Sequence, residues 1–540
     1  MDAPHDPTTP PVACRCETPR RSICDVVETE TALASRGRPR PGRLGATLLA
    51  VVLLAGCAVG PDYVAPESDV PDIWHVQLTE GLAEGEADLQ TWWTVLNDPL
   101  LESLIDRGIA GNLDLMQAVA RIDEARAQRG VARGELFPST DGIGSYRRDR
   151  LSEETHPTIP GRSRTDNFYS VGLDASWELD VFGRIRRSVE AATADLQAAV
   201  EDYRDVLVIL SATIAANYVD VRTFQERIQY ARSNAKRQRS SLRLTTDRNR
   251  AGLAPDLDVR QAELNLATTE SVIPAFESQL AQAVHRLGVL LGMYPSALYG
   301  ELEEPKPIPR PPERILVGVP ADLMRQRPDI RRAERVLAGE TARIGVATAD
   351  LYPRFFLLGS FTVDALTVGS LGTAAARSWS VGPSLRWNIF SGGRVRSNIK
   401  AQDARTVQAL LGYESTVLTA LEETENFLVA YAREAERREA LIRSVVAARE
   451  SVGLVLTLYR TGLTDFQNVL DMERSLFDQE DQLAASEGQV TQNLIGVYRA
   501  LGGGWAPPAD DEGATGSAGG ASAVPTSGVS GSPVTPPAAP

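Results

Sequence analysis

The chain has 540 residues, of which 43% are apolar, and a formal net charge of −15 at pH 7. This length is enough for a large buried core and for two to four domains, whereas the acidic balance argues against a nucleic-acid partner, which needs a basic face. Cys57 is the last cysteine in the sequence, so the chain beyond it cannot contain an internal disulfide. The four histidines are not spaced as metal ligands, and no metal site is expected.

The N-terminal region has the pattern of a secretory signal. Residues 36–57 read RGRPRPGRLGATLLAVVLLAGC, in which arginines precede an apolar run that is too short to span a bilayer. The ending Leu-Ala-Gly-Cys resembles a bacterial lipobox, which implies acylation of Cys57; a plain signal peptide that ends in cysteine by chance is the alternative. We expect residues 1–56 to be a pre-sequence whose true start can lie downstream of Met1, and residues 57–96 to be a lipidated N-terminal segment.

Most of the remaining chain consists of two related halves. ELFPSTDGIGSY at 135–146 matches DLYPRFFLLGSF at 350–361, and SWELDVFGRIRRSV at 176–189 matches RWNIFSGGRVRSNI at 386–399. A third pair of segments keeps the 210-residue offset of the second pair. The sequence therefore predicts an internal duplication. Its parts are a first repeat at 97–300, a Pro-rich linker at 301–319, a second repeat at 320–503 and a disordered Gly/Ala/Pro tail at 504–540.

Each repeat begins with a helix and continues into two strands. In FYSVGLDASWELDVF, apolar residues alternate with polar ones, and SWSVGPSLRWNIF has the same period of two, which is typical of a strand with one apolar face. We expect β-hairpins at 138–182 and 353–391, with Trp177 and Trp387 facing lipid. The alternative is a soluble four-stranded sheet over a helix. In a membrane, strands with unpaired edges must close into a barrel.

Two long helical hairpins come after the strands. Residues 184–251 contain neither proline nor glycine, and apolar residues recur there at three- and four-residue steps, which predicts a helix of roughly 100 Å. Glycines end this helix and its counterpart, so the sequence predicts helical hairpins at 184–292 and 394–501. The predicted tips carry Gly252 and Leu253 in the first repeat and Gly462 and Leu463 in the second.

At this point the sequence resembles the TolC-like outer-membrane efflux proteins, and especially the lipoprotein (NodT-type) branch that serves resistance-nodulation-division pumps. The motifs are CAVGPDYVAPE from Cys57, the segment at 92–127 that begins WWTVLNDPLLESL, VPADLMRQRPDIRRAE at 319–334, and the two tips. The resemblance implies an α+β membrane protein that forms a homotrimer. Each chain would contribute four strands to a twelve-stranded β-barrel, and this barrel would be continuous with a helical periplasmic tunnel. It also implies an outer-membrane exit duct for small molecules that works with a periplasmic membrane-fusion adaptor and an inner-membrane pump.

The resemblance assigns roles to a few residues at the tips. It implies that Asp471 faces the channel axis as a constriction, and that Asp258 and Tyr459 help to hold the tunnel shut. Asn468 and Thr464 depart from the family pattern, so a second acidic ring and part of the closing network do not carry over. Asp465, just past the glycine turn, is expected to cap a helix and point to solvent. The four tip residues Gly252, Leu253, Gly462 and Leu463 are the expected adaptor contacts.

Two other functions remain open from the sequence alone. An exit duct for type I protein secretion would have the same fold with a different partner, and a trimeric coiled-coil adhesin or stalk would also have long helices and a twelve-stranded barrel. The adhesin predicts a single strand segment at the C-terminus, whereas the strands here are internal and duplicated. No motif brings a nucleophile and a base together, and no phosphate-binding loop is present, so we expect no enzymatic activity and no cofactor other than lipid on Cys57.

Overall fold

The computed structural model describes residues 58–67, 70–76, 78–79, 81–85, 88–152, 154–155 and 165–506, all within the compact unit Gly56–Pro540. The expectations for the pre-sequence, for Cys57 and for residues 507–540 of the tail lie outside the described residues. The expected start of the disordered tail at 504 is wrong, because Gly504 donates to the Leu89 carbonyl at 2.7 Å and Trp505 is 6% exposed.

Four long helices form two hairpins. α4 (Arg184–Arg250, 67 residues) turns back into α5 (Asp256–Leu290, 35 residues), and α9 (Arg394–Thr461, 68 residues) turns back into α10 (Phe466–Ala500, 35 residues). At 1.5 Å per residue, α4 and α9 are each about 100 Å long. One apolar window of α4 is long enough to cross a membrane, but 61% of that window is buried inside the protein, so its apolar residues serve the core.

The elements that precede these hairpins also correspond between the two halves. α3 (Leu113–Gly134) and α8 (Pro328–Ala349) have 22 residues each, and β2 (Ser139–Arg150) and β5 (Arg354–Ala365) have 12 each. The sequence predicts one helix before the first strand, whereas the structure has two, because Asn112 accepts a hydrogen bond from the Leu115 amide and begins α3 after α2 (Pro99–Gly111). The duplication therefore extends to the lengths of these two pairs of elements.

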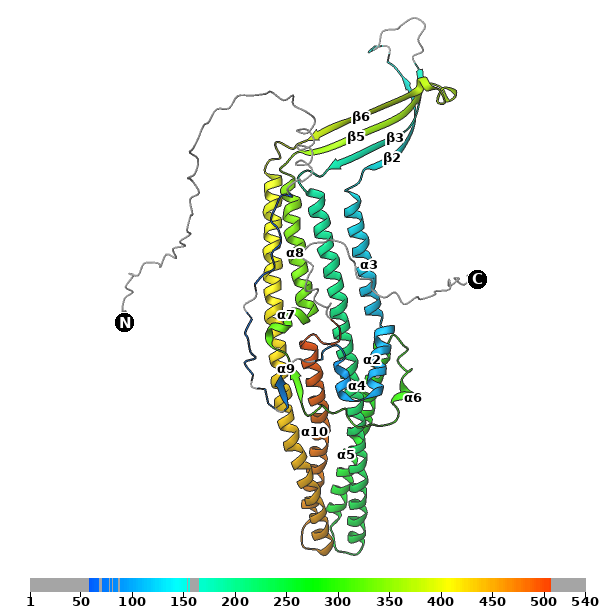
Figure 1. The fold of residues 1–540 in the computed structure, drawn as a ribbon. Coiled ribbons are helices and arrows are strands. Elements are labelled where there is room, and N and C mark those ends of the chain that lie inside the picture. Colours follow the sequence, from blue (N-terminus) through cyan, green and yellow to red (C-terminus); the bar gives the residue numbers. More distant parts are fainter. Residues whose placement is uncertain are drawn as a thin grey trace, which may run out of the picture. The chain divides into compact units, whose positions relative to one another are not determined.

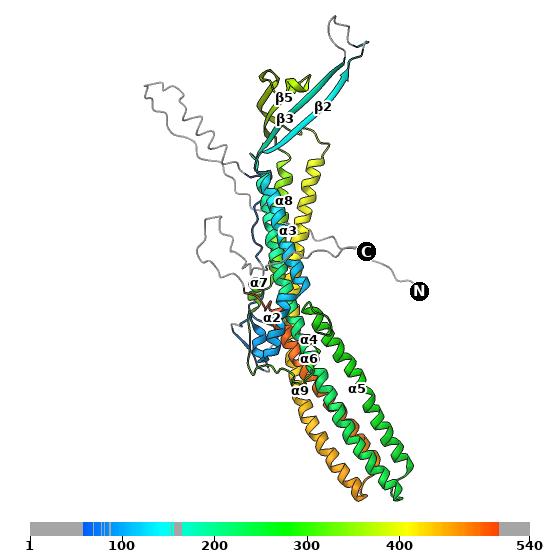
Figure 2. The same cartoon turned by 90° about the vertical axis from the view of Figure 1, so that its right-hand side faces the viewer.

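The strands form one antiparallel sheet in the order β2-β3-β5-β6, where β3 is Thr165–Leu179 and β6 is Arg377–Arg386. Figures 1 and 2 show this sheet at the end of the helices opposite to the two hairpin tips. β3 and β6 both end earlier than the alternation of apolar and polar residues predicts. In the first repeat the reason is Asp180. Its carboxylate accepts hydrogen bonds from the backbone amides of Ile185 and Arg186, so the chain begins α4 at this point and does not continue the strand.

One face of the sheet is apolar and exposed. Cross-strand pairs on this face join Leu173 to Phe361 and Phe361 to Trp379, and the Trp379 side chain is 74% exposed. On the other face, polar side chains bond across the strands, as Ser170 does to Asp364 at 2.6 Å. Trp177 and Trp387 lie at the helical end of the sheet, where each indole N–H donates to a carbonyl near the end of the preceding helix, that of Leu136 or of Leu351.

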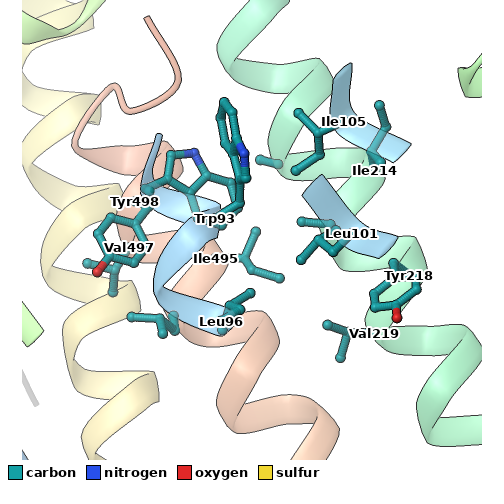
Figure 3. Packing of buried hydrophobic residues seen from close by; sticks show 14 of the residues in the cluster. Trp93, Leu96, Leu101, Ile105, Ile214, Tyr218, Val219, Ile495, Val497 and Tyr498 are labelled. Atoms are coloured by element: carbon teal, nitrogen blue, oxygen red, sulfur yellow. The ribbon is translucent and has the colours of Figure 1, made fainter. Parts of the chain in front are cut away.

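A hydrophobic core holds the helices together between the sheet and the tips. η1 (Trp92–Leu96) and α2 insert apolar side chains between α4 and α10, and Figure 3 shows Trp93 and Leu101 there, close to Ile214 and Tyr498. The Trp92 ring stacks on Tyr498 with their centroids 5.4 Å apart. Shorter elements surround this core: the parallel strands β1 (Leu82–Glu84) and β4 (Ile315–Val317), the helices α6 (Tyr299–Leu302) and α7 (Leu323–Gln326), and the 3-10 turn η2 (Pro320–Asp322). Two further 3-10 turns, η3 (Val368–Ser370) and η4 (Ala374–Ala376), lie in the connection between β5 and β6.

Candidate functional site

The two hairpin tips have the same backbone geometry. Gly252 (φ +75°) and Gly462 (φ +78°) both adopt the left-handed conformation that glycine favours. The amide of Leu253 bonds to the carbonyl of Arg248 at 2.8 Å, and the amide of Leu463 bonds to that of Leu458 at 2.9 Å. This is the Schellman arrangement, which satisfies the last carbonyls of a helix. It leaves the Leu253 and Leu463 side chains 66% and 76% exposed, so each tip ends in an apolar group without cover in this chain.

A small apolar cluster lies beneath the second tip. Tyr459 is only 3% exposed and packs against Phe466, with their ring centroids 5.3 Å apart, among Val455, Val469 and Leu470. The Tyr459 hydroxyl has no hydrogen-bond partner, and no bond joins it to Asp258 within the described chain. The part of Tyr459 that holds the tip is therefore its ring.

Arg248, which the sequence analysis did not single out, joins the two tips. Its guanidinium stacks over the Tyr459 ring at 4.7 Å and donates to the carbonyl oxygens of Tyr459 at 2.9 Å and of Arg460 at 3.2 Å. These carbonyls belong to the last turn of α9, where a cation also meets the negative end of the helix dipole. The sequence feature that could have identified Arg248 is a difference between the two repeats, because the equivalent position in the second repeat is Leu458.

Asp258 lies between opposing charges. Burial and the carboxylate of Asp465 raise the pKa of Asp258, and the Arg248 guanidinium opposes that rise. A raised pKa means that the folded tip favours neutral Asp258. The contribution of Asp258 to the stability of the tip is therefore greatest in acid and is lost as the pH rises through the Asp258 pKa. Asp465 occupies the N-cap position of α10, but its side chain makes no capping bond. The expectation that this side chain acts as a cap is wrong.

Asp471 stands apart from this cluster. It is exposed and accepts a hydrogen bond from Gln467 at 2.9 Å within its own helix. Asn468, one turn closer to the tip, donates to Thr464 at 2.9 Å. Asn468 and Asp471 recur at helical spacing on α10, and Thr464 precedes the helix and bonds to Asn468, so the three form one polar stripe at this end of α10. The structure thus brings Asp258 and Tyr459 to a common neighbour, Arg248, and leaves Asp471 on a separate exposed face.

The first described residues after Cys57 are fixed at the base of the sheet. The Val59 amide donates to the carbonyl of Phe182 at 3.1 Å, just beyond the end of β3. Arg187, which is 4% exposed, donates to the Asp62 carboxylate at 2.6 Å and to the carbonyls of Val59 and Gly60. Cys57 itself lies outside the described residues, but the chain that leads to it reaches the junction between strand and helix.

No group of three or more His, Cys, Asp or Glu side chains that could hold a metal occurs in the described part of the chain. The chemistry of the tips is that of carboxylates, arginines and an aromatic ring. Such groups can bind or repel charge and hold two helices together.

Comparisons with known proteins agree with this geometry. A family model described as outer membrane efflux protein matches residues 104–293 and 319–503. Nodulation protein T of Rhizobium leguminosarum bv. trifolii is 33% identical over 465 residues, which cover 85% of this chain and 97% of that protein. The solvent efflux pump outer membrane protein SrpC of Pseudomonas putida is 30% identical over 466 residues, with 85% and 97% covered.

Solved structures show the same fold. The outer-membrane channel OprN has a TM-score of 0.77 and 36% identity, covering 83% of this chain and 100% of that one. A crystal structure of CusC has a TM-score of 0.74 and 27% identity, with 83% and 100% covered. These relatives favour efflux over protein secretion or adhesion, and the protein is an outer-membrane efflux channel that extends into the periplasm. The chain belongs to the outer membrane efflux protein family.

Proposed function

We propose that three copies of this chain form the exit duct of a tripartite efflux system, in which twelve strands close one β-barrel that continues into a helical tunnel. The duct passively conducts small molecules from an inner-membrane resistance-nodulation-division pump, through a periplasmic adaptor, to the outside. The observation that carries the proposal is a four-stranded sheet with an exposed apolar face and two unpaired edges, from which helices of 67 and 68 residues lead away (Figure 1).

Physical chemistry supports closure by further copies. Within the described chain, β2 pairs only with β3, and β6 pairs only with β5, so each has one edge of free amides and carbonyls. A lipid environment offers no water to satisfy them, and a spanning sheet must therefore close on itself. The polar face would then line the duct, while the apolar face would meet lipid. Trp177 and Trp387, at the helical end of the sheet, suit the interfacial band of aromatic residues that such barrels carry.

We propose small molecules as the substrates without naming a chemical class. The named relatives include a solvent efflux protein and a cation efflux protein, so related ducts serve different substrates. We therefore assign the choice of substrate to the pump and assign transit to this chain. We also propose that the protein is not an enzyme and that it needs no cofactor besides the lipid on Cys57.

The tips provide both a partner surface and a constriction. The exposed Leu253 and Leu463 side chains would be covered by the adaptor, since apolar groups favour burial. Three copies of Asp471 on the exposed stripe of α10 would converge on the axis as an anionic ring. Arg248, Tyr459 and Asp258 would hold the two tips of each copy together.

The face of the sheet can be tested with one charge. Phe361→Arg places a cation in the middle of the apolar row and should cost about 2–4 kcal/mol at mid-membrane. Ser360→Arg, one residue earlier and on the polar face, is the matched control. We expect the first variant to lose most of its folded oligomer on unheated gels and the second to retain it. Equal recovery of the two would mean that this face does not meet lipid.

Lipidation of Cys57 is tested by mass spectrometry of the mature N-terminus. We expect a diacylglyceryl group on the thiol and a third acyl chain on the amino group. Each buried methylene adds about 0.8 kcal/mol to membrane affinity, so three chains anchor the protein independently of its barrel. An unmodified cysteine, or cleavage at another residue, would refute this part of the proposal. Cys57→Ser should still reach the membrane through its strands.

The constriction is tested by single-channel recording of purified trimers. Asp471→Ala should weaken the preference for cations and the block by multivalent cations, because the anionic ring attracts positive charge. Asp247→Ala removes an exposed carboxylate that is paired with Arg250 near the first tip, and serves as the control. If Asp471→Ala leaves conductance and selectivity unchanged in an intact trimer, the constriction lies elsewhere.

A further inference from the structure

α2 and η1 cover one side of the long helices α4 and α10. Ile214 of α4 packs against α2, where a Cβ atom added to Gly108 would lie 2.2 Å from Ile214 Cδ1, and Tyr498 of α10 stacks on Trp92 of η1. In the proposed duct these shorter elements would lie outside the ring of helices, because inside it they would fill the tunnel. The opposite sides of α4 and α10 would then face the lumen.

Two adjoining hollows lie on this luminal side. On α4, four of their lining residues recur at three- and four-residue steps and so share one face: Asp205, Ile209, Ala212 and Ala216. Ile214 is two residues away from both alanines, which is about 200° around the helix. The first hollow, of about 270 Å³, lies where α10 ends and α8 begins, and the second, of about 230 Å³, lies between α4, α9 and α10.

Arg499 of α10 lines both hollows and has no carboxylate partner. Its guanidinium lies over the ring of Phe427 on α9, 5.3 Å from the ring centroid. This ring packs directly on the backbone of α10, because a Cβ atom added to Gly496 would lie 2.3 Å from the nearest ring carbons. Within the described residues, no hydrogen bond or ion pair joins the Arg499 guanidinium to another group. The cation is therefore held in place by an aromatic ring but is not neutralised.

The first hollow also contains a carboxylate without a partner. Asp205 makes no hydrogen bond or ion pair within the described part of the chain. The two other carboxylates of this hollow, Asp329 of α8 and Glu423 of α9, both accept hydrogen bonds from Arg327. Among the described residues, the hollow thus holds one carboxylate and one guanidinium that are both free to bind a guest.

The charge of Asp205 depends on the pH. Burial and the Asp329 carboxylate raise the pKa of Asp205 to about 6. Arg332 and Arg327 oppose this rise, and Asp202 adds to it. Asp205 is therefore charged at neutral pH and becomes neutral in mild acid.

The two free charges do not belong to the repeated scaffold. α4 and α10 correspond to α9 and α5 at an offset of 210, so the counterparts of Asp205 and Arg499 are Ser415 and Val289. The equivalent surface between α9 and an α5 helix would therefore have neither charge. The hollows are a feature of the contact between α4 and α10 alone.

The charges of the first hollow favour a guest that carries both signs. A simple anion would meet the carboxylates of Asp205, Asp329 and Glu423, and a simple cation would meet the two arginines. A zwitterion instead satisfies the two groups that lack partners.

We propose that the two hollows form a luminal binding site for small zwitterionic molecules, in which Arg499 binds a carboxylate, Asp205 binds an ammonium group and Phe427 contacts the apolar part of the guest. This inference rests on the proposed duct and gives it a chemical class of substrate that pauses in transit. Three copies would place three such sites at one level of the lumen. The pump still selects the substrate, since the hollows are small and open.

The site is tested with three phenyl probes by saturation-transfer difference NMR on the purified protein in detergent, with empty micelles as the blank. L-Phenylalanine carries both charges, whereas 2-phenylethylamine lacks the carboxylate and 3-phenylpropionate lacks the ammonium group. At neutral pH we expect phenylalanine to bind in the millimolar range and roughly two- to fivefold more tightly than either other probe, the gain from one partly exposed ion pair. Equal affinities for the three probes would overturn the proposal.

Variants assign the two charges. Arg499→Gln and Asp205→Asn should each weaken phenylalanine binding roughly two- to fivefold, and Arg499→Lys, which keeps the charge, should retain most of it. The matched controls are Arg433→Gln, exposed on α9, and Asp202→Asn, one turn before Asp205 and outside both hollows, and they should bind as the wild type does. If Arg499→Gln binds phenylalanine as Arg433→Gln does, the proposed site is wrong. Native mass spectrometry of each sample reports assembly separately, so lost binding in an intact trimer refutes the site, and the absence of a trimer refutes the duct.

The pH dependence of phenylalanine binding provides an independent readout. Lowering the pH to about 5 protonates Asp205 and should weaken binding roughly twofold in the wild type, because the ammonium group loses its partner. Asp205→Asn should bind equally at both pH values. A wild-type affinity that does not change with pH, or a change that persists in Asp205→Asn, would contradict the role of Asp205.

Discussion

Unpaired backbone at the two edges of the sheet is the constraint on which the rest of the structure depends. β2 and β6 each satisfy one side of their amides and carbonyls within the described chain, and a membrane supplies nothing for the other side. In the proposed trimer, closure by further copies would satisfy these groups and would also determine how the helices are arranged. Each strand pair leads into a long helix whose hairpin tip lies at the end away from the sheet (Figure 2), so a closed ring of strands would set the helices in a ring as well.

The duplication provides a nearly symmetric scaffold, and function depends on where the symmetry is broken. The strand registers are equivalent, since Ser139 pairs with Ser176 as Arg354 pairs with Arg386. The side chains between the helices are not. Arg248 has Leu458 as its counterpart, and Arg237 has Ala447. Both arginines lie on α4 and contact the second repeat, Arg248 at the carbonyl of Tyr459 and Arg237 at the carboxylate of Glu480.

Much of the architecture was predictable because its signals are periodic. Alternation identified the strand hairpins, and the absence of proline and glycine identified α4. The ends of elements were less predictable, since they depend on single side chains such as Asp180, which ends the alternating segment by capping α4. The positions of Gly252 and Gly462 at the tips were predictable from the restricted conformations available to other residues.

The contacts between helices were not predictable in the same way. Glu480 and Glu270 look alike in sequence, as glutamates in polar helices, yet only the first is buried. Tertiary packing decides which face of a largely polar helix is buried. The spacing of the apolar residues along such a helix does not identify that face. Arg248 was missed for the same reason, and the role expected of Asp465 as a cap was wrong because its side chain makes no capping bond.

The central claim is that this chain closes its sheet only as a trimer. Native mass spectrometry of the protein extracted in mild detergent, with circular dichroism on the same sample, tests this most directly. The account predicts a single species of three times the mass of the mature lipidated chain, with the β-sheet signal retained. A monomer that keeps its β-sheet signal would contradict it, because four strands would then be stable with their edges unpaired.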